Sequence, residues 1–290
     1  ESINLIANTW GRANLRRGDV VVLTHMEHHA NIVPWHMLAS EIGIELRWIP
    51  LTSDGQLDLG TLPELLDGAK LLSFTAMSNV LGTITPVAAL CAAAHDAGAL
   101  ALVDACQYVP HNVTDVRAWN ADFVTFSGHK MVGPSGIGVM WGREALLDAM
   151  PPFLGGGNMI ADVRVDGFTC AELPAKFEAG TPPIVEAVGL GAAVDYLTNI
   201  GMANVRRHEM DLTQGWRTHI HFGSVPEDPE RIARLQAART PSLLAPVHGL
   251  QIGVVTDNED PDNEFRVRVK LPLVRSEEHT SELQSRGLIS

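Results

Sequence analysis

"ADFVTFSGHKMVGPSG" (residues 121–136) is an apolar run that leads, through a glycine, to a lysine and then to a second glycine. The segment 121–128 is typical of a buried strand, and the glycines predict tight turns on either side of Lys130. A lysine at the exit of a buried strand is costly unless it is paired or has a chemical role. Lys130 is therefore the first candidate functional residue, and the strand before it is the first predicted element of the fold.

The first 150 residues around this stretch alternate between strand-like and helix-like segments. Strands are expected at 19–24, 44–51, 69–77, 99–105, 121–128 and 136–142. Helices are expected at 1–10, 31–43, 59–68, 86–98 and 143–150, and one long helix is expected at 183–214. Strands that alternate with crossover helices indicate an α/β fold with a mostly parallel sheet. Residues 249–274 read as a separate short β-hairpin-like segment.

Composition excludes several classes of function. A net charge of −13 argues against nucleic acid as the main partner. No apolar run approaches the roughly 20 residues that cross a membrane, and no signal peptide is visible. Three widely spaced cysteines form no disulfide framework and fit a reducing cytoplasm. The chain starts with Glu1 rather than Met, so an upstream segment is expected.

Polar side chains follow the predicted strands at the edge where ligands bind in parallel sheets. "HMEHHAN" follows 19–24, Asn79 follows 69–77, Asp104 ends the strand at 99–105, and "SGHK" ends the strand at 121–128. A desolvated aspartate seeks a cation or a donor, and a desolvated lysine can form a Schiff base with a carbonyl. An aspartate at a pyridinium nitrogen and a lysine on the aldehyde are the fixed points of pyridoxal 5'-phosphate (PLP) enzymes. Asp104 and Lys130 therefore predict a PLP site.

Five motifs in order resemble the class V aminotransferase family, and within it the SufS-like cysteine desulfurases and selenocysteine lyases. They are "MEHHANIVPW" (26–35), "SNVLGT" (78–83), "VDACQ" (103–107), "SGHKMVGPSGIGVMW" (127–141) and "FEAGTPP" (177–183). The resemblance covers residues 1–215 and implies a fold type I, PLP-dependent transferase large domain.

The resemblance implies a role for each matching residue. Lys130 resembles the lysine that binds the cofactor and later moves the substrate's α-proton. His28 resembles the histidine that stacks on the cofactor ring and assists proton transfer. Asp104 resembles the partner of the pyridine nitrogen, and Gln107 the donor to the ring hydroxyl.

Further residues match the substrate and phosphate positions. Asn79 resembles the asparagine beside the ring hydroxyl and the substrate carboxylate. Ser127 and His129 match the phosphate-binding pair, and Thr181 resembles the threonine that reaches the phosphate of the neighbouring subunit, which implies a homodimer. A metal site in "MEHH" is not expected, because adjacent histidines point in different directions and no His-Glu-x-x-His helix is present.

The implied reaction removes sulfur from L-cysteine, or selenium from L-selenocysteine, and leaves L-alanine and an enzyme persulfide. The resemblance also implies a sulfur-acceptor protein and a role in iron–sulfur cluster assembly. Alternatives are a kynureninase-like enzyme, an aminotransferase, or a structural spike or baseplate protein with a fused N-terminal domain. The last rests on residues 249–274, which resemble the start of an OB-fold in phage baseplate and type VI secretion spike proteins.

The chain departs from the family pattern at both ends. It begins after a Gly-Thr-Thr turn of the family, and it lacks the family's Arg-x-Gly-x-His-Cys loop with the nucleophilic cysteine. Cys91 is expected in the core, Cys106 too deep to be that nucleophile, and Cys170 exposed. An incomplete, inactive piece is therefore expected.

The predicted domains follow from these departures. Residues 1–185 form the PLP-binding large domain, and 186–214 a connecting helix. Residues 215–274 form an unrelated or misjoined segment. Residues 275–290 form a tail that is expected to be translated from a sequencing adapter rather than from the natural gene.

Overall fold

The computed structural model describes residues 1–215, 254–257 and 268–270. The chain divides into two units, Glu1–Arg217 and Thr218–Ser290. All five motifs lie in the first unit. In the second, β9 (Val254–Asp257) pairs antiparallel with β10 (Arg268–Lys270), as a hairpin-like segment requires.

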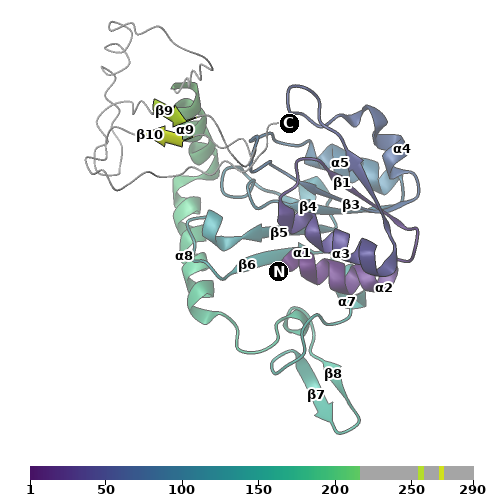
Figure 1. Ribbon diagram of the computed structural model, residues 1–290. Coiled ribbons are helices and arrows are strands. Elements are labelled where there is room, and N and C mark those ends of the chain that lie inside the picture. The colour runs from purple at the N-terminus through teal and green to yellow at the C-terminus, as the bar shows by residue number, and fades with distance from the viewer. Residues whose placement is uncertain (216–253, 258–267, 271–290) are drawn as a thin grey trace, which may run out of the picture. The chain divides into compact units, whose positions relative to one another are not determined.

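A six-stranded sheet forms the centre of the first unit (Figure 1), in the order β2-β1-β3-β4-β5-β6. Neighbouring strands run parallel except β6, which runs antiparallel to β5. The strands are β1 (Val20–Thr24), β2 (Glu45–Ile49), β3 (Ala69–Thr75), β4 (Leu100–Asp104), β5 (Phe123–Ser127) and β6 (Gly138–Gly142). The predicted α/β fold with a mostly parallel sheet is confirmed.

Helices cover both faces of the sheet, and the alternation of side chains along each strand builds a core on each face. In β1, Val20 and Val22 pack with α4 (Leu62–Leu66) and α5 (Val87–Asp96), while Val21 and Leu23 pack on the other face with α1 (Ser2–Ile6) and α3 (Val33–Ile42). Because every strand residue of β1 is buried, the run reads as continuously apolar rather than alternating.

Start and stop signals place several helix boundaries. Pro34 lies in the first turn of α3, and Gly43 ends that helix with φ 84°, a conformation that favours glycine. The N-terminal helix combines α1, a π-helical stretch (Ala7–Gly11) and α2 (Arg12–Asn14). Two short helices, α6 (Val116–Trp119) and α7 (Glu144–Ala149), flank β5 and β6.

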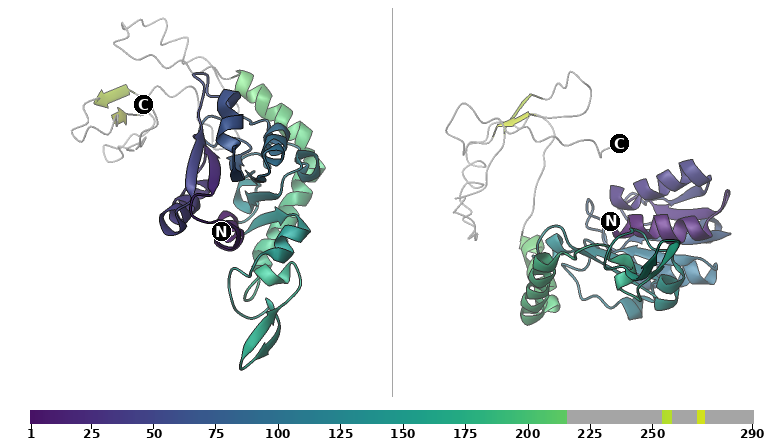
Figure 2. Two further views of the ribbon diagram at one scale, coloured as in Figure 1. Left: turned by 90° about the vertical axis from the view of Figure 1, so that its right-hand side faces the viewer. Right: turned by 90° about the horizontal axis from the view of Figure 1, so that it is seen from below.

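The last part of the first unit differs from the sequence-based expectation. The single helix predicted at 183–214 is two helices, α8 (Ile184–Ile200) and α9 (Met202–Gly215), because Gly201 adopts φ 84° and ψ 120°. The region at 155–170, where no strand is expected from sequence, contains a hairpin of β7 (Ile160–Arg164) and β8 (Gly167–Cys170). This hairpin projects from the rest of the unit (Figures 1 and 2).

No helix in the described part of the chain has the length and apolar character needed to cross a membrane.

Candidate functional site

Three neighbouring strands bring polar side chains to the carboxyl edge of the sheet. Thr75 is in register with Asp104, and Asp104 with Thr125. All three are at most 5% exposed. Leu102 and Phe123 precede Asp104 and Thr125 by two residues and pack on the face covered by α1 and α3, so side-chain alternation directs the polar residues to that face.

Asp104 keeps part of its carboxylate available. One oxygen accepts a hydrogen bond from the backbone N–H of Cys106 at 3.0 Å. The Cys106 thiol also interacts with this carboxylate, and no described residue other than Cys106 donates to it. A buried carboxylate with an unused acceptor position favours a positively charged donor, such as a pyridinium N–H. The donor set at Asp104 therefore fits the ring nitrogen of PLP.

The hydroxyl of Thr125 lies beside Asp104 and has no partner among the described residues. A buried hydroxyl without a partner destabilises the folded state by about 1–3 kcal/mol. Natural proteins place such orphaned groups mainly where water or a ligand completes the bond. Thr125 was not among the residues predicted from sequence, and it marks the same edge of the sheet.

Lys130 lies in a one-turn 3₁₀ helix (Gly128–Lys130) directly after β5 and is half-buried. Glycines make this turn possible: a Cβ on Gly128 would lie 3.0 Å from the carbonyl oxygen of Ile137, and one on Gly133 would lie 2.9 Å from that of Gly128. Val132 has φ 53°, which is rare for a β-branched residue. Strained backbone of this kind gathers at functional sites.

Cys106 links the lysine and the aspartate in space. Its Sγ lies 3.5 Å from Ser127 Oγ. Burial, and next the charge of Asp104, raise the pKa of the Cys106 thiol to about 11, while the charge of Lys130 opposes the rise. The thiol thus lies within electrostatic reach of both Asp104 and Lys130. The structure therefore brings Asp104, Ser127 and Lys130 to one site, as the strand exits predict.

The thiols differ in expected reactivity. Burial raises the pKa of Cys91 to about 12, and Cys91 is buried. Cys106 and Cys170 are both half-buried, so Cys170, which ends the hairpin strand β8, is less exposed than expected from sequence. Because the thiolate is the nucleophile, we expect Cys106 to be alkylated at pH 8 roughly a hundredfold more slowly than an ordinary thiol. Cys170 should be alkylated first, as mass spectrometry of the native chain would show. In a Cys170→Ser control the fast phase should disappear; a fast phase assigned to Cys106 would contradict the expectation.

His28, Asn79, Gln107 and His129 follow the strands at this edge, and among the described residues neither they nor Thr181 hydrogen-bond to Asp104 or Lys130. His28 is exposed, and its Nδ1 accepts a hydrogen bond from the backbone N–H of Ala30 at 3.1 Å. Gln107 is half-buried, and three residues are exposed: Asn79, His129 and Thr181. Their roles stay predictions.

Glu27 is a buried residue that sequence reasoning missed. It is 7% exposed, and its carboxylate accepts hydrogen bonds from Thr24 Oγ1, Asn31 Nδ2 (2.7 Å) and Thr75 N–H (3.0 Å). Burial is the main cause that raises its pKa to about 8, against these hydrogen bonds, and the nearby charge of Asp104 adds to the rise. Its place directly before His28 was the one sequence signal that could have identified it.

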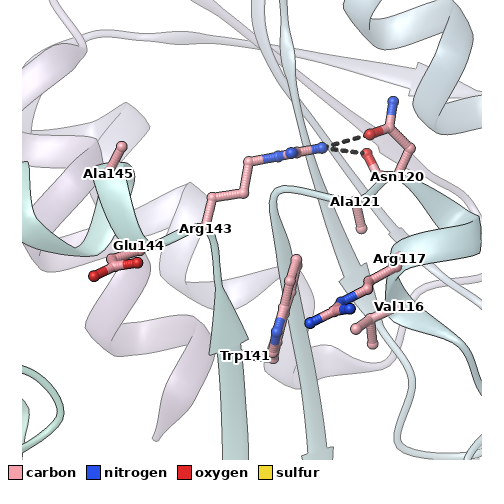
Figure 3. A pocket seen from close by; sticks show the side chains of 8 residues that line it. All are labelled: Val116, Arg117, Asn120, Ala121, Trp141, Arg143, Glu144 and Ala145. Atoms are coloured by element: carbon pink, nitrogen blue, oxygen red, sulfur yellow. Dashed lines mark hydrogen bonds between the residues drawn. The ribbon is translucent and has the colours of Figure 1, made fainter.

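A hollow of about 460 Å³ lies at the other end of β5 (Figure 3). It is lined by residues of α6, of the segment just before β5, of the end of β6 and of the start of α7, among them Arg117, Trp141 and Glu144. In it, Arg143 donates to the carbonyl and side-chain oxygens of Asn120 at 3.1 and 2.6 Å. Because β5 runs from this hollow toward Ser127, the hollow is separate from the Asp104–Lys130 edge.

Within residues 1–215 and the two short strands beyond them, no three His, Cys, Asp or Glu side chains are grouped to hold a metal ion.

Comparison with known proteins identifies relatives of the whole first unit. The family described as "Aminotransferase class-V" matches residues 1–224. The probable cysteine desulfurase of Streptomyces coelicolor is 52% identical over 219 residues, which cover 74% of this chain and 52% of that protein. The probable cysteine desulfurase of Synechocystis is 50% identical over 265 residues, which cover 89% of this chain and 62% of that protein. The chain thus spans about half to three-fifths of the curated relatives it matches.

Solved structures agree with this assignment. The crystal structure of the cysteine desulfurase CsdA (S-sulfonic acid) from Escherichia coli matches with a TM-score of 0.68 and 41% identity, over 70% of this chain and 51% of that one. The apo cysteine desulfurase of Thermococcus onnurineus matches with a TM-score of 0.71 and 34% identity, over 94% of this chain and 62% of that one. The resemblance to the class V aminotransferase family and the fold class are confirmed. The domain boundaries at 185, 214 and 274 stay predictions, as does the OB-fold resemblance of residues 249–274, which lie mostly outside the described residues.

Proposed function

This chain belongs to the class-V aminotransferase family, within which its close homologues are cysteine desulfurases, and we propose that the protein is a cysteine desulfurase. L-Cysteine and an acceptor thiol would yield L-alanine and a persulfide on the acceptor. The observation that carries this proposal is the convergence of Asp104, Cys106 and Lys130 at the exits of β4 and β5. About half of the aligned residues are identical to those of proteins named as probable cysteine desulfurases.

The family is PLP-dependent, and the residues at this edge fit that cofactor. The carboxylate of Asp104 has an acceptor position free for the ring nitrogen. Lys130 lies on a turn built from glycines, and glycines let the backbone approach a ligand closely. PLP supplies an electron sink that stabilises the carbanion formed when the substrate's α-proton leaves. Lys130 would bind the aldehyde carbon, and Asp104 would hold the ring nitrogen in its protonated form.

The remaining residues would orient cofactor and substrate. Ser127 and His129, which flank Gly128, would donate to the phosphate, because a doubly charged group favours hydroxyl, imidazole and backbone donors. Gln107 and Asn79 would donate to the ring hydroxyl, and Asn79 would also contact the substrate carboxylate. Lys130, freed by substrate, would carry the α-proton as a general base. His28 would stack on the ring and assist this transfer.

We propose a homodimer in which Thr181 completes the phosphate site of the partner. The support is an exposed apolar surface on α8, where Ile184, Val185 and Val188 are 61, 80 and 71% exposed. Patches of this kind mark protein–protein contacts. Only Leu190, Ala193 and Leu197 of the residues in α8 are buried within the first unit.

The dimer predicts the effect of a charge on α8. We expect Val188→Asp to shift the chain from dimer to monomer, because the interface would bury an unpaired carboxylate. Light scattering after size-exclusion chromatography measures this mass. Thr198→Asp, on the same helix and also exposed, should leave the mass unchanged. A parent chain that is already monomeric at micromolar concentration would contradict the dimer.

The substrate is tested by the product. With PLP present, L-cysteine, L-selenocysteine and L-kynurenine are supplied separately, and alanine is quantified with the second product: sulfide or persulfide, selenide, or anthranilate. The chain alone is expected to be inactive, because it lacks the nucleophilic cysteine. With an added thiol as acceptor, we expect alanine from L-cysteine, or from L-selenocysteine if the protein is the lyase. Alanine and anthranilate from kynurenine alone would replace the proposal by the kynureninase-like alternative. A sulfur-acceptor protein for iron–sulfur cluster assembly is the partner we propose for the persulfide.

A further inference from the structure

Beneath the candidate site lies a buried polar cluster formed by Glu27, Thr24, Asn31, Ser73 and Thr75. These residues are at most 7% exposed and come from β1, the segment before α3, and β3. Ser73 Oγ and Trp35 Nε1 both donate to Asn31 Oδ1, at 2.6 and 3.2 Å. These two bonds fix the amide of Asn31 so that its Nδ2 points at Glu27.

The orientation of Asn31 leaves Glu27 surrounded by donors. Thr24 Oγ1 and Thr75 N–H reach one carboxylate oxygen, and Asn31 Nδ2 reaches the other. The cluster joins the exit of β1 to the exit of β3, whose last residue is in register with Asp104. Thr75 Oγ1 and the Ala76 N–H also lie 3.4 and 2.8 Å from the carbonyl oxygen of Asp104.

His28 directly follows Glu27, and both ends of its short loop are bonded. Glu27 binds Asn31 across the base of the loop, and His28 Nδ1 accepts from Ala30 N–H. The second bond requires a bare Nδ1, so the neutral imidazole carries its proton on Nε2. The direction of the His28 ring therefore depends on a loop whose anchor is Glu27.

We propose that Glu27 is a positioning residue, whose carboxyl ties the His28 loop to the exits of β1 and β3 and so fixes the imidazole beside the Asp104 site. This inference rests on the proposed function for the role of His28, while the contacts of Glu27 stand independently of it. Glu27 touches neither cofactor nor substrate and acts through His28.

A reciprocal exchange of side chains tests this role. Glu27→Gln places an amide nitrogen opposite Asn31 Nδ2, so two donors face each other. Asn31→Asp places two carboxyls together. In the double variant, the new carboxylate at position 31 accepts from the new amide at position 27 and still accepts from Ser73 and Trp35, so the bond is restored with its direction reversed. The single variants break the anchor, and the double variant rebuilds it without a change in net charge relative to the parent.

The first readout is the His28 imidazole in the full chain at pH 9, where Glu27, with a pKa raised to about 8, is mostly ionised. It is observed by ¹⁵N NMR and assigned with a His28→Gln variant. We expect a single Nε2–H tautomer in the parent, loss of that signature in both single variants, and its return in the double variant. Exchange of the Ala30 amide should rise about tenfold in the singles, as loss of one hydrogen bond of about 1.4 kcal/mol implies. A general loss of stability would not restore the tautomer in the double variant.

The second readout is PLP affinity, from the visible absorption of the bound cofactor. The single variants should bind PLP about tenfold more weakly, because they lose the same hydrogen bond of about 1.4 kcal/mol. The double variant should bind PLP with an affinity within about twofold of the parent's. If the parent shows no PLP band and so does not differ from Lys130→Ala, the proposed function is overturned. The NMR result then decides the role of Glu27.

Two outcomes would overturn the inference. One is an unchanged His28 spectrum in Glu27→Gln; the other is a double variant that behaves like the singles. If Glu27→Gln does not fold, Thr24→Val removes one donor and keeps the carboxylate. That variant should still broaden or shift the His28 signals, and an unchanged spectrum there counts against the inference in the same way.

Discussion

Lys130→Ala is expected to abolish the covalent complex with PLP. The parent, mixed with PLP and dialysed, should keep a visible absorption band, and reduction with borohydride should trap the cofactor on the peptide that contains Lys130. The alanine variant should show neither, because no other lysine within residues 1–215 lies at this edge of the sheet. This is the largest effect on the proposed activity, because alanine release should fall to background as well.

Lys176 provides a matched control for this result. It is another half-buried lysine of the first unit, and its Nζ donates to the carbonyl oxygens of Leu147 and Asp148 at 3.2 and 2.8 Å. Lys176→Ala should lower stability and leave the PLP band in place. Retention of the trapped cofactor in Lys130→Ala, or its loss in Lys176→Ala, would contradict the assignment of the cofactor lysine.

The central strands β1, β3, β4 and β5 could be predicted because most of their residues are buried on both faces of the sheet. Each of them is a short apolar run between turn residues, and the ends of such runs locate the carboxyl edge. Asp104 and Lys130 were placed from those ends and from chemistry alone. Asp104 and Lys130 come close in space because they follow β4 and β5, which are neighbouring strands in the structure.

The elements that were missed lack this local signal. The β7–β8 hairpin is exposed along most of its length, so its sequence carries no buried pattern, and Val163 and Phe168 are 59 and 54% exposed. At Gly201 the helical pattern continues on both sides, and one backbone conformation separates α8 from α9. A glycine inside a helical pattern does not by itself identify a break.

Glu27 and Thr125 were missed for a different reason. The contacts that matter for them come from far along the chain: Glu27 binds Thr75, 48 residues away, and Thr125 lies beside Asp104 on another strand. Only pairing of the strands reveals that one carboxylate is surrounded by donors and one hydroxyl has none. Buried polar groups of this kind are set by tertiary structure and not by a local pattern.

The other end of the sheet carries a polar cluster that predicts a stability effect. Asp122 directly precedes β5, and its side chain is 5% exposed. The carboxylate accepts from Ala101 N–H (2.8 Å), His95 Nε2 (2.8 Å) and Arg143 Nε (2.7 Å), and so connects α5, β4 and the end of β6. We expect Asp122→Ala to lower the free energy of unfolding by about 1–3 kcal/mol, because the buried Ala101 N–H loses its partner while Arg143, 42% exposed, keeps access to water.

Urea unfolding, followed by tryptophan fluorescence, measures this change. Asp162→Ala is the matched control, because Asp162 pairs with Arg164 at the same kind of distance, 2.8 Å, but with side chains 52 and 62% exposed. Exposed pairs contribute about 0–1 kcal/mol, so the control should stay near the parent. At a temperature where Asp122→Ala remains folded, it should bind PLP like the parent, because Asp122 lies at the amino end of β5 and Lys130 beyond its carboxyl end. Equal effects of the two substitutions would show that the buried cluster does not stabilise this edge, and lost PLP binding in folded Asp122→Ala would show that the two ends of the sheet are coupled.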